Sequence, residues 1–369
     1  MKIYQCIHKY APHIPQFEAR HGISDELNIS FSQLQSLIIQ DGYAAVYRLE
    51  PPSDAAYNMV FFTIWDYERL QRLWAKEHNL SVKCSLDDIR IAQIQWLNAD
   101  VVYDMSGYYH REFISKLKEA SINCTTVLWN GIIEQQVKPL TLQDYDYHVS
   151  LYRPYIDAWQ KQGMKAFELQ PSIPKCWESQ SDNMSRDVDI LMYGQTGIKF
   201  FNERNKLINQ LLTFKLKYNI SVKLQISDSH SVNYFYDHIM DIEPPVYGVE
   251  LYNAIRRSKI VINKCTDNNF SFKSNMRVFE AIGNGALLVT EKGAYPEGIK
   301  SGIDFLEYSS TEELWDLIDN ILEDWDKWSA FANKAKVRLM KNFSKKSQWA
   351  TFTSNIINSK ALSNQLAKI

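Results

Sequence analysis

Arg277 and Glu280 are the residues of this chain whose types and spacing best suit the binding of a charged substrate. They lie three positions apart, so a helix through this stretch presents both on one side. A fixed cation stabilises negative charge that develops during a reaction, and a carboxylate accepts hydrogen bonds from hydroxyl groups. An ordinary ion pair on a helix surface has the same spacing, and the spacing alone favours this second interpretation.

The stretch around this pair predicts a short helix followed by a strand. Apolar residues recur at helical spacing on one face, and Gly283 and Gly285 are typical of a helix end. The run ALLVT that follows has the length and composition of a buried parallel strand. In open α/β sheets, ligands bind beyond the carboxyl ends of the strands. The start of this helix is therefore a candidate ligand site.

A second candidate element is RDVDILMYGQTG, a predicted strand whose loop is bounded by Gly194 and Gly197. Glycine lets the backbone approach a phosphate closely, and the N-terminus of the helix predicted from about Asn202 favours negative charge. Arg204 falls in the first turn of that helix, where the macrodipole disfavours a cation unless an anion lies nearby. Such a loop alone is common among α/β turns.

Three segments of the second half resemble the C-terminal half of CgeB-like glycosyltransferases, relatives of the large group 1 family. They are VYGVELYNAIRRSKIVINKC, NMRVFEAIGNGALLVTE and GIDFLEYSSTEEL. The residues that fall on the family's pattern, in order, are Arg277, Phe279, Glu280, Ala281, Gly285, Glu313 and Leu314. The resemblance covers residues 186 to about 345 well and the first half more loosely. It implies an α/β chain of the GT-B fold, with two Rossmann-like domains facing a central cleft.

The resemblance also implies a site for a nucleotide-sugar donor in the second domain. Glu280 stands at the position that binds the donor ribose in the wider group, where two carboxylate oxygens suit adjacent hydroxyls. Arg277 and Arg204 are expected at the phosphates, with Gly194 and Gly197 at the close backbone approach. Three further residues are expected in the same site: Asn263, Lys273 and Asn275.

One part of the group 1 pattern is missing. Many group 1 enzymes carry a Glu eight residues before the Glu of the Glu-Ala pair, which is Glu280-Ala281 in this chain. Phe272 occupies that earlier position here. The absence weakens any transfer of that group's catalytic detail to this chain. It also keeps open a second hypothesis, a catalytically degenerate GT-B protein that binds nucleotide or glycan as a scaffold.

The first half offers candidates for the acceptor side and for a general base. Asp104 follows a predicted buried strand, and Asp104 and His110 are the candidate bases because α/β ligand sites lie at such strand ends. The alternative is that Asp104 or Ser106 caps the following helix. Further candidates that line the acceptor side are His8, Lys9, Trp129 and Asn130, and His13, Arg20 and His21 lie near the first loop.

Length and composition bound the remaining possibilities. The 369 residues suit two domains, which we place at 1–175 and 176–345, with a helix at 346–369 that crosses back to the first. A net charge of −2 provides no basic field for nucleic acid, and contact with a membrane would be peripheral at most. No signal-peptide pattern is present, and five scattered cysteines indicate a reduced, cytoplasmic protein.

The leading interpretation is a glycosyltransferase that moves a sugar from a nucleotide-sugar donor to a hydroxyl of a glycan or glycoconjugate, in surface polysaccharide assembly. No cofactor is expected beyond this donor substrate, and no metal, because no Asp-x-Asp pair lies in a suitable loop. A phosphosugar enzyme of the epimerase or phosphorylase kind is a third hypothesis. A Rossmann dehydrogenase is disfavoured because no G-x-G-x-x-G opens either half.

Overall fold

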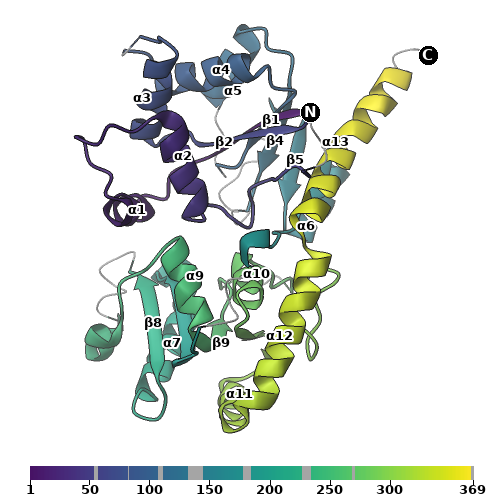
Figure 1. Ribbon diagram of the computed structural model, residues 1–369. Helices are drawn as coiled ribbons and strands as arrows, with labels where there is room; N and C mark the ends of the chain where they lie inside the picture. Colours follow the sequence, from purple (N-terminus) through teal and green to yellow (C-terminus); the bar gives the residue numbers. More distant parts are fainter. Residues whose placement is uncertain are drawn as a thin grey trace. The chain divides into compact units, whose positions relative to one another are not determined.

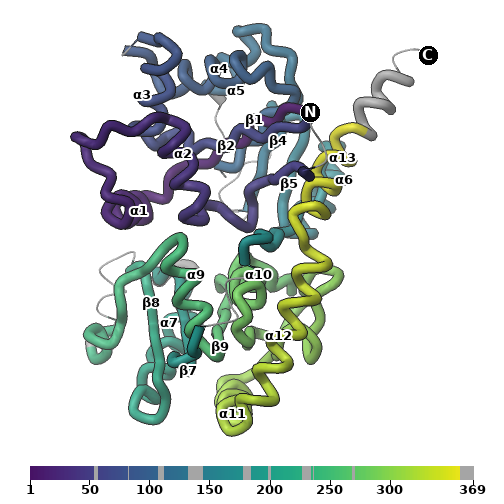
Figure 2. The backbone as a smooth tube through the Cα atoms, viewed as in Figure 1, coloured from purple at the N-terminus to yellow at the C-terminus, as the bar shows by residue number. Residues whose placement is uncertain are grey.

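The computed structural model describes residues 1–53, 57–81, 83–106, 111–131, 144–177, 184–226, 234–267 and 271–366 (Figures 1 and 2). The chain divides into two compact units. Unit 1 comprises Met1–Pro171 together with Lys345–Ile369, and unit 2 comprises Ser172–Ser344. The sequence placed its domain boundaries at residues 175 and 345.

Unit 1 is a parallel sheet with helices. Its strand order is β2-β1-β3-β4-β5-β6, and every neighbouring pair is parallel. The strands are β1 (Lys2–Ile7), β2 (Met59–Ile64), β3 (Val101–Asp104), β4 (Thr125–Trp129), β5 (Tyr147–Ser150) and β6 (Ala166–Glu168). All four residues of β3 are buried, as expected for a central parallel strand covered on both faces.

The helices of unit 1 before the linker are α1 (His13–His21), α2 (Phe31–Gln40), α3 (Glu68–Glu77), α4 (Leu86–Leu97), α5 (Arg111–Glu119) and α6 (Arg153–Lys161). Local sequence explains where two of them begin. Ser30 caps α2 through a capping box with Gln33, and Ser85 caps α4 in the same way with Asp88.

Unit 2 is a second parallel sheet, of order β11-β10-β9-β7-β8. Its strands are β7 (Val188–Gln195), β8 (Ile220–Gln225), β9 (Ser258–Asn263), β10 (Leu287–Glu291) and β11 (Leu306–Tyr308). Its α-helices are α7 (Ile198–Thr213), α9 (Val249–Arg256), α10 (Met276–Gly283), α11 (Thr311–Glu323) and α12 (Trp325–Asn342), and short 3-10 helices are η3 (Lys175–Trp177) and η4 (Tyr236–Asp241). The predicted helix and strand around Glu280 are α10 and β10.

One boundary in unit 2 differs from the sequence-based expectation. Helix α7 begins at Ile198, directly after Gly197, so a short helical segment precedes the helix predicted from about Asn202. The backbone of Phe201 is non-helical inside it, so the helix is kinked there. The helical segment after the kink begins at about Asn202, as the sequence predicted, and Arg204 lies in its first turn.

The last helix, α13 (Lys345–Leu366), belongs to unit 1. Trp349, Phe352 and Ile356 join the core cluster that also contains Ile3 and Tyr103. The Lys345 ammonium, which is buried, donates to the carbonyl oxygens of Ala45 and Arg48, the latter at 2.6 Å. Gln348 donates to Val46 O at 3.1 Å and Gln170 O at 3.0 Å. Polar anchors and apolar packing together hold this helix to the unit.

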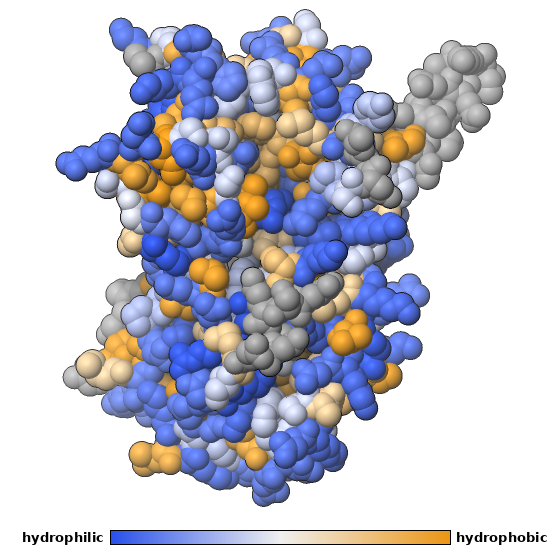
Figure 3. Space-filling model, in the orientation of Figure 1, coloured by the Kyte–Doolittle hydropathy of each residue, from blue (hydrophilic) through white to orange (hydrophobic). Residues whose placement is uncertain are grey.

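Much of the surface in Figure 3 is hydrophilic, with apolar residues in small groups. Among the described residues, no helix combines the length and the apolar character that crossing a bilayer would need.

We expect Lys345→Met to lower the free energy of unfolding of unit 1 by about 2 kcal/mol, because two buried carbonyls lose a charged donor. Chemical denaturation of the full chain measures the change. Lys346→Met is the matched control, since Lys346 is exposed in the same turn and its replacement should change the free energy by less than about 0.5 kcal/mol. Equal effects of the two substitutions would contradict the anchoring role of Lys345.

Candidate functional site

The carboxyl ends of the parallel strands of unit 2 meet at one edge of its sheet. β7 ends at Gln195, β9 at Asn263 and β10 at Glu291, and α10 begins at Met276 after the loop that follows β9. Parallel strands bring their carboxyl ends to the same edge, where ligands of α/β proteins bind. The candidate residues Asn263, Lys273, Asn275 and Arg277 gather at this edge, as their hydrogen bonds and ion pairs show.

Glu280 is almost fully buried on α10, with 3% of the residue exposed. The Tyr193 hydroxyl, from β7, donates to its Oε2 at 2.9 Å. Burial raises the pKa of Glu280, while the hydrogen bond from Tyr193 and the charge of Arg277 act in the opposite direction. The interpretation of Arg277 and Glu280 as an exposed surface ion pair is therefore wrong: the carboxylate is an internal group with a specific donor.

Arg277 is positioned by two asparagines and a glycine. Asn275 caps α10 by accepting from the Arg277 N–H at 2.9 Å, and its amide donates to Asn263 Oδ1 at 3.1 Å. The Arg277 guanidinium donates to the same Asn263 oxygen at 3.4 Å. Gly194 has φ +144°, and a Cβ there would lie 2.7 Å from Arg277 Nη2. Gly194 thus allows close approach by the Arg277 side chain, where the sequence predicted close approach by a phosphate.

Arg204 braces two strand ends from inside the unit. It is 2% exposed, and its guanidinium donates to Lys264 O at 2.6 and 3.0 Å and to Gln195 O at 3.0 Å. Burial, and then the like charge of Arg277, lower the pKa of Arg204 to about 9. Its donors are directed at backbone carbonyls, so the geometry supports a positioning role for Arg204 rather than the direct phosphate contact predicted from the sequence.

Two lysines share one carboxylate at the same edge. Glu291, the last residue of β10, lies 3.2 Å from Lys273 Nζ and 3.5 Å from Lys264 Nζ, and it accepts from the Cys265 N–H at 2.8 Å. One negative charge therefore faces two positive ones. The sequence analysis missed Glu291 and Tyr193, although both lie at or near the end of a strand, which is the signal that would have found them.

The first unit places the candidate base Asp104 in a closed network. The residue is fully buried, and its carboxylate lies 3.4 Å from the Arg90 guanidinium and accepts from Tyr145 OH at 3.0 Å. Ser106 donates to the other oxygen through its N–H at 3.0 Å and its hydroxyl at 2.6 Å. The Arg90 guanidinium lies over the Phe113 ring at 3.5 Å. These contacts argue against a base open to an acceptor. The other candidate base, His110, lies outside the described residues.

The loop after β1 is fixed by contacts with its backbone. Tyr43 OH donates to His8 O at 3.0 Å and accepts from the Tyr10 N–H at 2.6 Å. Asp66 accepts from the Lys9 N–H. The Lys9 residue is exposed and His8 is half-buried, so this loop presents both predicted acceptor-side residues from a fixed backbone.

The remaining polar residues of that region converge on Asp41. His13 Nε2 lies 2.9 Å from its carboxylate, Arg20 Nε 2.8 Å and His21 Nε2 3.2 Å. Burial would raise the pKa of Asp41, but hydrogen bonds from His13 and Arg20 outweigh it, so the pKa is lowered. The cluster joins α1 to the end of α2, which accounts for His13, Arg20 and His21 structurally.

Trp129 and Asn130, the other acceptor-side candidates, lie at the end of β4. The Trp129 ring packs against Tyr47, with centroids 5.2 Å apart, and a Cβ at Gly131 would lie 2.4 Å from it. Asn130 is 3% exposed, and its N–H donates to Val149 O at 2.8 Å. Asn130 is therefore enclosed, whereas Trp129 is half-buried, and its stacking role on the acceptor side stays a prediction.

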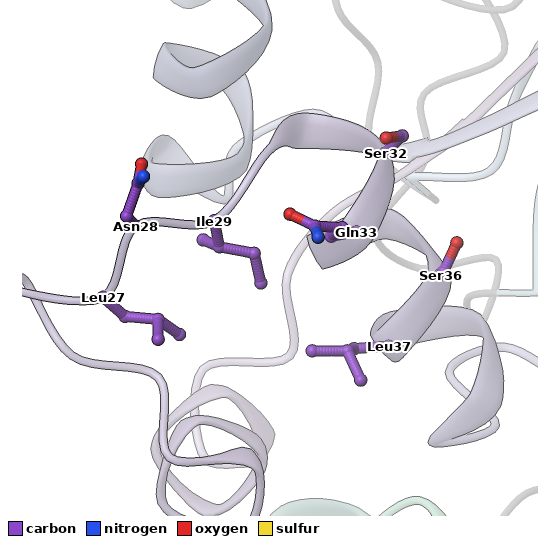
Figure 4. Close-up of a pocket in the computed structure, with 7 residues that line it drawn as sticks. All are labelled: Leu27, Asn28, Ile29, Ser32, Gln33, Ser36 and Leu37. Atoms are coloured by element: carbon purple, nitrogen blue, oxygen red, sulfur yellow. The ribbon is translucent and has the colours of Figure 1, made fainter.

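Unit 1 also has a surface groove of about 500 Å³ beside α2 (Figure 4). Leu27, Ile29 and Leu37 point toward one another across it. Its other lining residues are Asn28, Ser32, Gln33 and Ser36, so the lining carries no charge. None of the predicted site residues lines this groove. In the part of the chain that the structure describes, no group of three or more His, Cys, Asp or Glu side chains is placed to hold a metal ion.

Comparisons with known proteins bear on this arrangement. Residues 204–354 match a family model described as glycosyl transferase-like, which is less than half of the chain. A search of the curated proteins found no match.

Solved structures resemble the chain over most of its length. HepE of Anabaena, in complex with UDP and glucose, has 12% identity and a TM-score of 0.58, with 97% of this chain and 100% of that chain covered. A glycosyltransferase from Rickettsia africae has 11% identity and a TM-score of 0.56, with 96% and 97% covered. A point mutant of TarM of S. aureus, in complex with Fondaparinux, alpha-GlcNAc-glycerol and UDP, has 9% identity and a TM-score of 0.54, with 73% and 59% covered. At these identities the likeness shows the fold, and the predicted α/β GT-B fold class is confirmed. The narrower CgeB-like family stays a prediction.

We expect Asp104→Asn to lower the free energy of unfolding by about 3–5 kcal/mol, because Arg90 would remain buried without this carboxylate. Urea denaturation measures the change. Asp157→Asn is the control, since Asp157 forms an exposed ion pair with Arg153 at 2.9 Å and its loss should cost less than about 1 kcal/mol. An Asp104→Asn protein of wild-type stability would contradict the structural role.

We expect Gly194→Ala to displace the Arg277 side chain, because the new methyl group would meet the end of that flexible side chain. The positive φ adds a strain of about 1 kcal/mol. The melting temperature should fall by a few degrees, whereas binding of a nucleoside diphosphate should weaken about tenfold or more. Gly302→Ala is the control, since its φ is +72° and a Cβ there meets nothing within 4 Å. A matching loss of binding in the control would contradict the steric explanation.

Proposed function

We propose that this chain is a glycosyltransferase that moves a sugar from a nucleotide-sugar donor to a hydroxyl of a glycan or glycoconjugate acceptor. The observation that carries the proposal is the arrangement at the carboxyl edge of unit 2. There a buried carboxylate, Glu280, lies one helical turn from Arg277. The match of residues 204–354 to a glycosyl transferase-like family supports the same conclusion.

Each group at this edge suits one part of the donor. The Glu280 carboxylate accepts hydrogen bonds from ribose hydroxyls. Arg277, with Lys273 and Lys264, neutralises the diphosphate, because Glu291 balances only one of the two lysine charges. Asn263 and Asn275 hold Arg277 in position, and Arg204 holds the ends of β7 and β9 together.

The reaction places its largest electrostatic demand on the leaving group. The bond between the sugar's anomeric carbon and the diphosphate oxygen breaks, and a bond to the acceptor oxygen forms as the acceptor hydroxyl gives its proton to water or to the departing diphosphate. Negative charge grows on the departing diphosphate, and preorganised cations in a partly dry site stabilise that charge. The fixed cations at this edge can supply that stabilisation from protein side chains, so we propose a metal-independent hexosyl transfer.

The proposal includes the cellular setting of the reaction. We place the reaction in the cytoplasm, in the assembly of surface polysaccharide or glycoconjugate. Because HepE of Anabaena was solved with UDP and glucose, UDP is the first nucleotide to test. A degenerate scaffold protein would bind nucleotide without turnover. A phosphosugar enzyme would turn over the donor without a glycan acceptor.

We expect UDP, or one of GDP, ADP, CMP and dTDP, to raise the melting temperature of the wild-type protein, and Glu280→Gln to reduce that effect. A ligand that binds only the folded state stabilises it by roughly 2.7 kcal/mol at one hundred times its dissociation constant. The pKa of Glu280 is raised by burial, so the carboxylate protonates at a higher pH than an exposed one. The ratio of wild-type to Glu280→Gln affinity should therefore narrow as the pH falls.

Glu323→Gln is the control for this experiment, because Glu323 is exposed at the end of α11. If no nucleotide stabilises the wild-type protein at millimolar concentration, the donor-site assignment is wrong. Binding without any sugar transfer to hydroxyl acceptors or to water would favour the scaffold hypothesis.

A further inference from the structure

We propose that Tyr193 is a positioning residue of the donor site, whose hydroxyl fixes the Glu280 carboxylate so that the site prefers ribonucleotides over deoxyribonucleotides. This inference rests on the proposed function. Tyr193 lies near the end of β7, is 7% exposed and reaches Glu280 Oε2 at 2.9 Å. The two residues lie 87 positions apart in the chain, so the contact depends on the fold of unit 2.

The hydroxyl meets a requirement that burial imposes on Glu280. A carboxylate removed from water needs hydrogen-bond donors to stay ionised. Burial, and then the negative charge of Glu280, raise the pKa of Tyr193. The phenol therefore keeps its proton and remains a donor to the carboxylate across the physiological range of pH.

The contact leaves one carboxylate oxygen for a ligand. Oε2 accepts from Tyr193, and within the described ranges no hydrogen bond reaches Oε1. The terminal torsion of a glutamate has a broad energy minimum, so an unheld carboxylate would present its oxygens in many directions. With Oε2 held, Oε1 has a fixed direction toward a donor hydroxyl. The sequence suggested two equivalent oxygens for two hydroxyls, and the structure makes them inequivalent.

The same tyrosine also contacts the residue assigned to the phosphates. The Arg277 guanidinium carbon lies 5.7 Å from the centroid of the Tyr193 ring, within the range of a cation–π interaction. Tyr193 thus contacts both the proposed ribose-binding carboxylate and the proposed phosphate-binding cation. The Tyr193 ring packs in the interior, whereas its hydroxyl donates a hydrogen bond to Glu280. The substitution Tyr193→Phe removes the hydroxyl and keeps the ring, so it separates the two contributions.

The test is isothermal titration of UDP and 2′-deoxy-UDP into the wild-type protein, Tyr193→Phe, Glu280→Gln and the double variant. We expect the wild-type protein to bind UDP more tightly than 2′-deoxy-UDP. Tyr193→Phe should weaken the binding of UDP about tenfold, as expected for a lost hydrogen bond to a charged group. It should also reduce the ratio of the affinity for UDP to the affinity for 2′-deoxy-UDP. In the Glu280→Gln background the same substitution should change UDP affinity less than about twofold, because the group it positions is already altered.

Tyr308→Phe is the matched control. Tyr308 is buried in β11 of the same unit, and its hydroxyl has no hydrogen-bond partner in the described structure, so removing it should leave UDP affinity unchanged. The double variant also removes the charge that Tyr193 satisfies, so it remains measurable if Tyr193→Phe alone does not fold. A double variant that binds UDP more weakly than Glu280→Gln would overturn the proposal.

The outcomes separate this inference from the proposed function. If the wild-type protein binds neither UDP nor any other nucleoside diphosphate, the proposed function itself fails. If UDP binds and Glu280→Gln weakens it, but Tyr193→Phe matches the wild type, Tyr193 has no positioning role and the proposed function stands. Equal losses of affinity for UDP and 2′-deoxy-UDP in Tyr193→Phe would also overturn the inference. The substitution would then weaken nucleotide binding in general and would not affect recognition of the ribose hydroxyl.

Discussion

A carboxylate removed from water must be satisfied by donors, and this constraint organises the polar interior of both units. Glu280 in unit 2 is 3% exposed, and Asp104 in unit 1 is fully buried. Asp104 has donors on both oxygens, from Ser106 on one and Tyr145 on the other. Glu280 has a donor on Oε2, from Tyr193. A saturated carboxylate stabilises the fold and has little capacity left for a ligand, whereas a half-satisfied one retains the capacity to bind.

The same comparison applies to the cations. Arg90 lies against the ring of Phe113 beside Asp104, and Arg204 directs its donors at the carbonyls of Lys264 and Gln195. The hydrogen bond from the Arg277 guanidinium to Asn263 is 3.4 Å, which is long for such a donor. The two buried arginines therefore stabilise the protein interior, and Arg277 retains strong donors for an anion.

The sequence predicted local structure well where short-range chemistry decides it. The glycines at the end of α10 and the buried run of β10 each act over a few residues, and both were found. The sequence could not predict the partner of Glu280, because Tyr193 comes from a strand 87 positions away. For the same reason it could not predict that Arg277, from a distant helix, approaches Gly194 closely, and the approach of a phosphate to this glycine stays a prediction.

Strand ends explain why residues that are distant in the chain gather at the candidate site. In a parallel sheet every strand delivers its last residues to one edge, so Asn263, Glu291 and Tyr193 meet there although they are distant in the chain. Which of them contacts which depends on strand order, β10-β9-β7, and that order is set by packing across the sheet. β9 lies beside β10, so the Asn263 amide donates to Thr290 Oγ1 of β10 at 3.1 Å, while its oxygen accepts from Asn275 and Arg277 at the start of α10. The sequence therefore named some residues of this edge, such as Asn263, and missed others, such as Glu291 and Tyr193, whereas the topology of the sheet determines which of them are in contact.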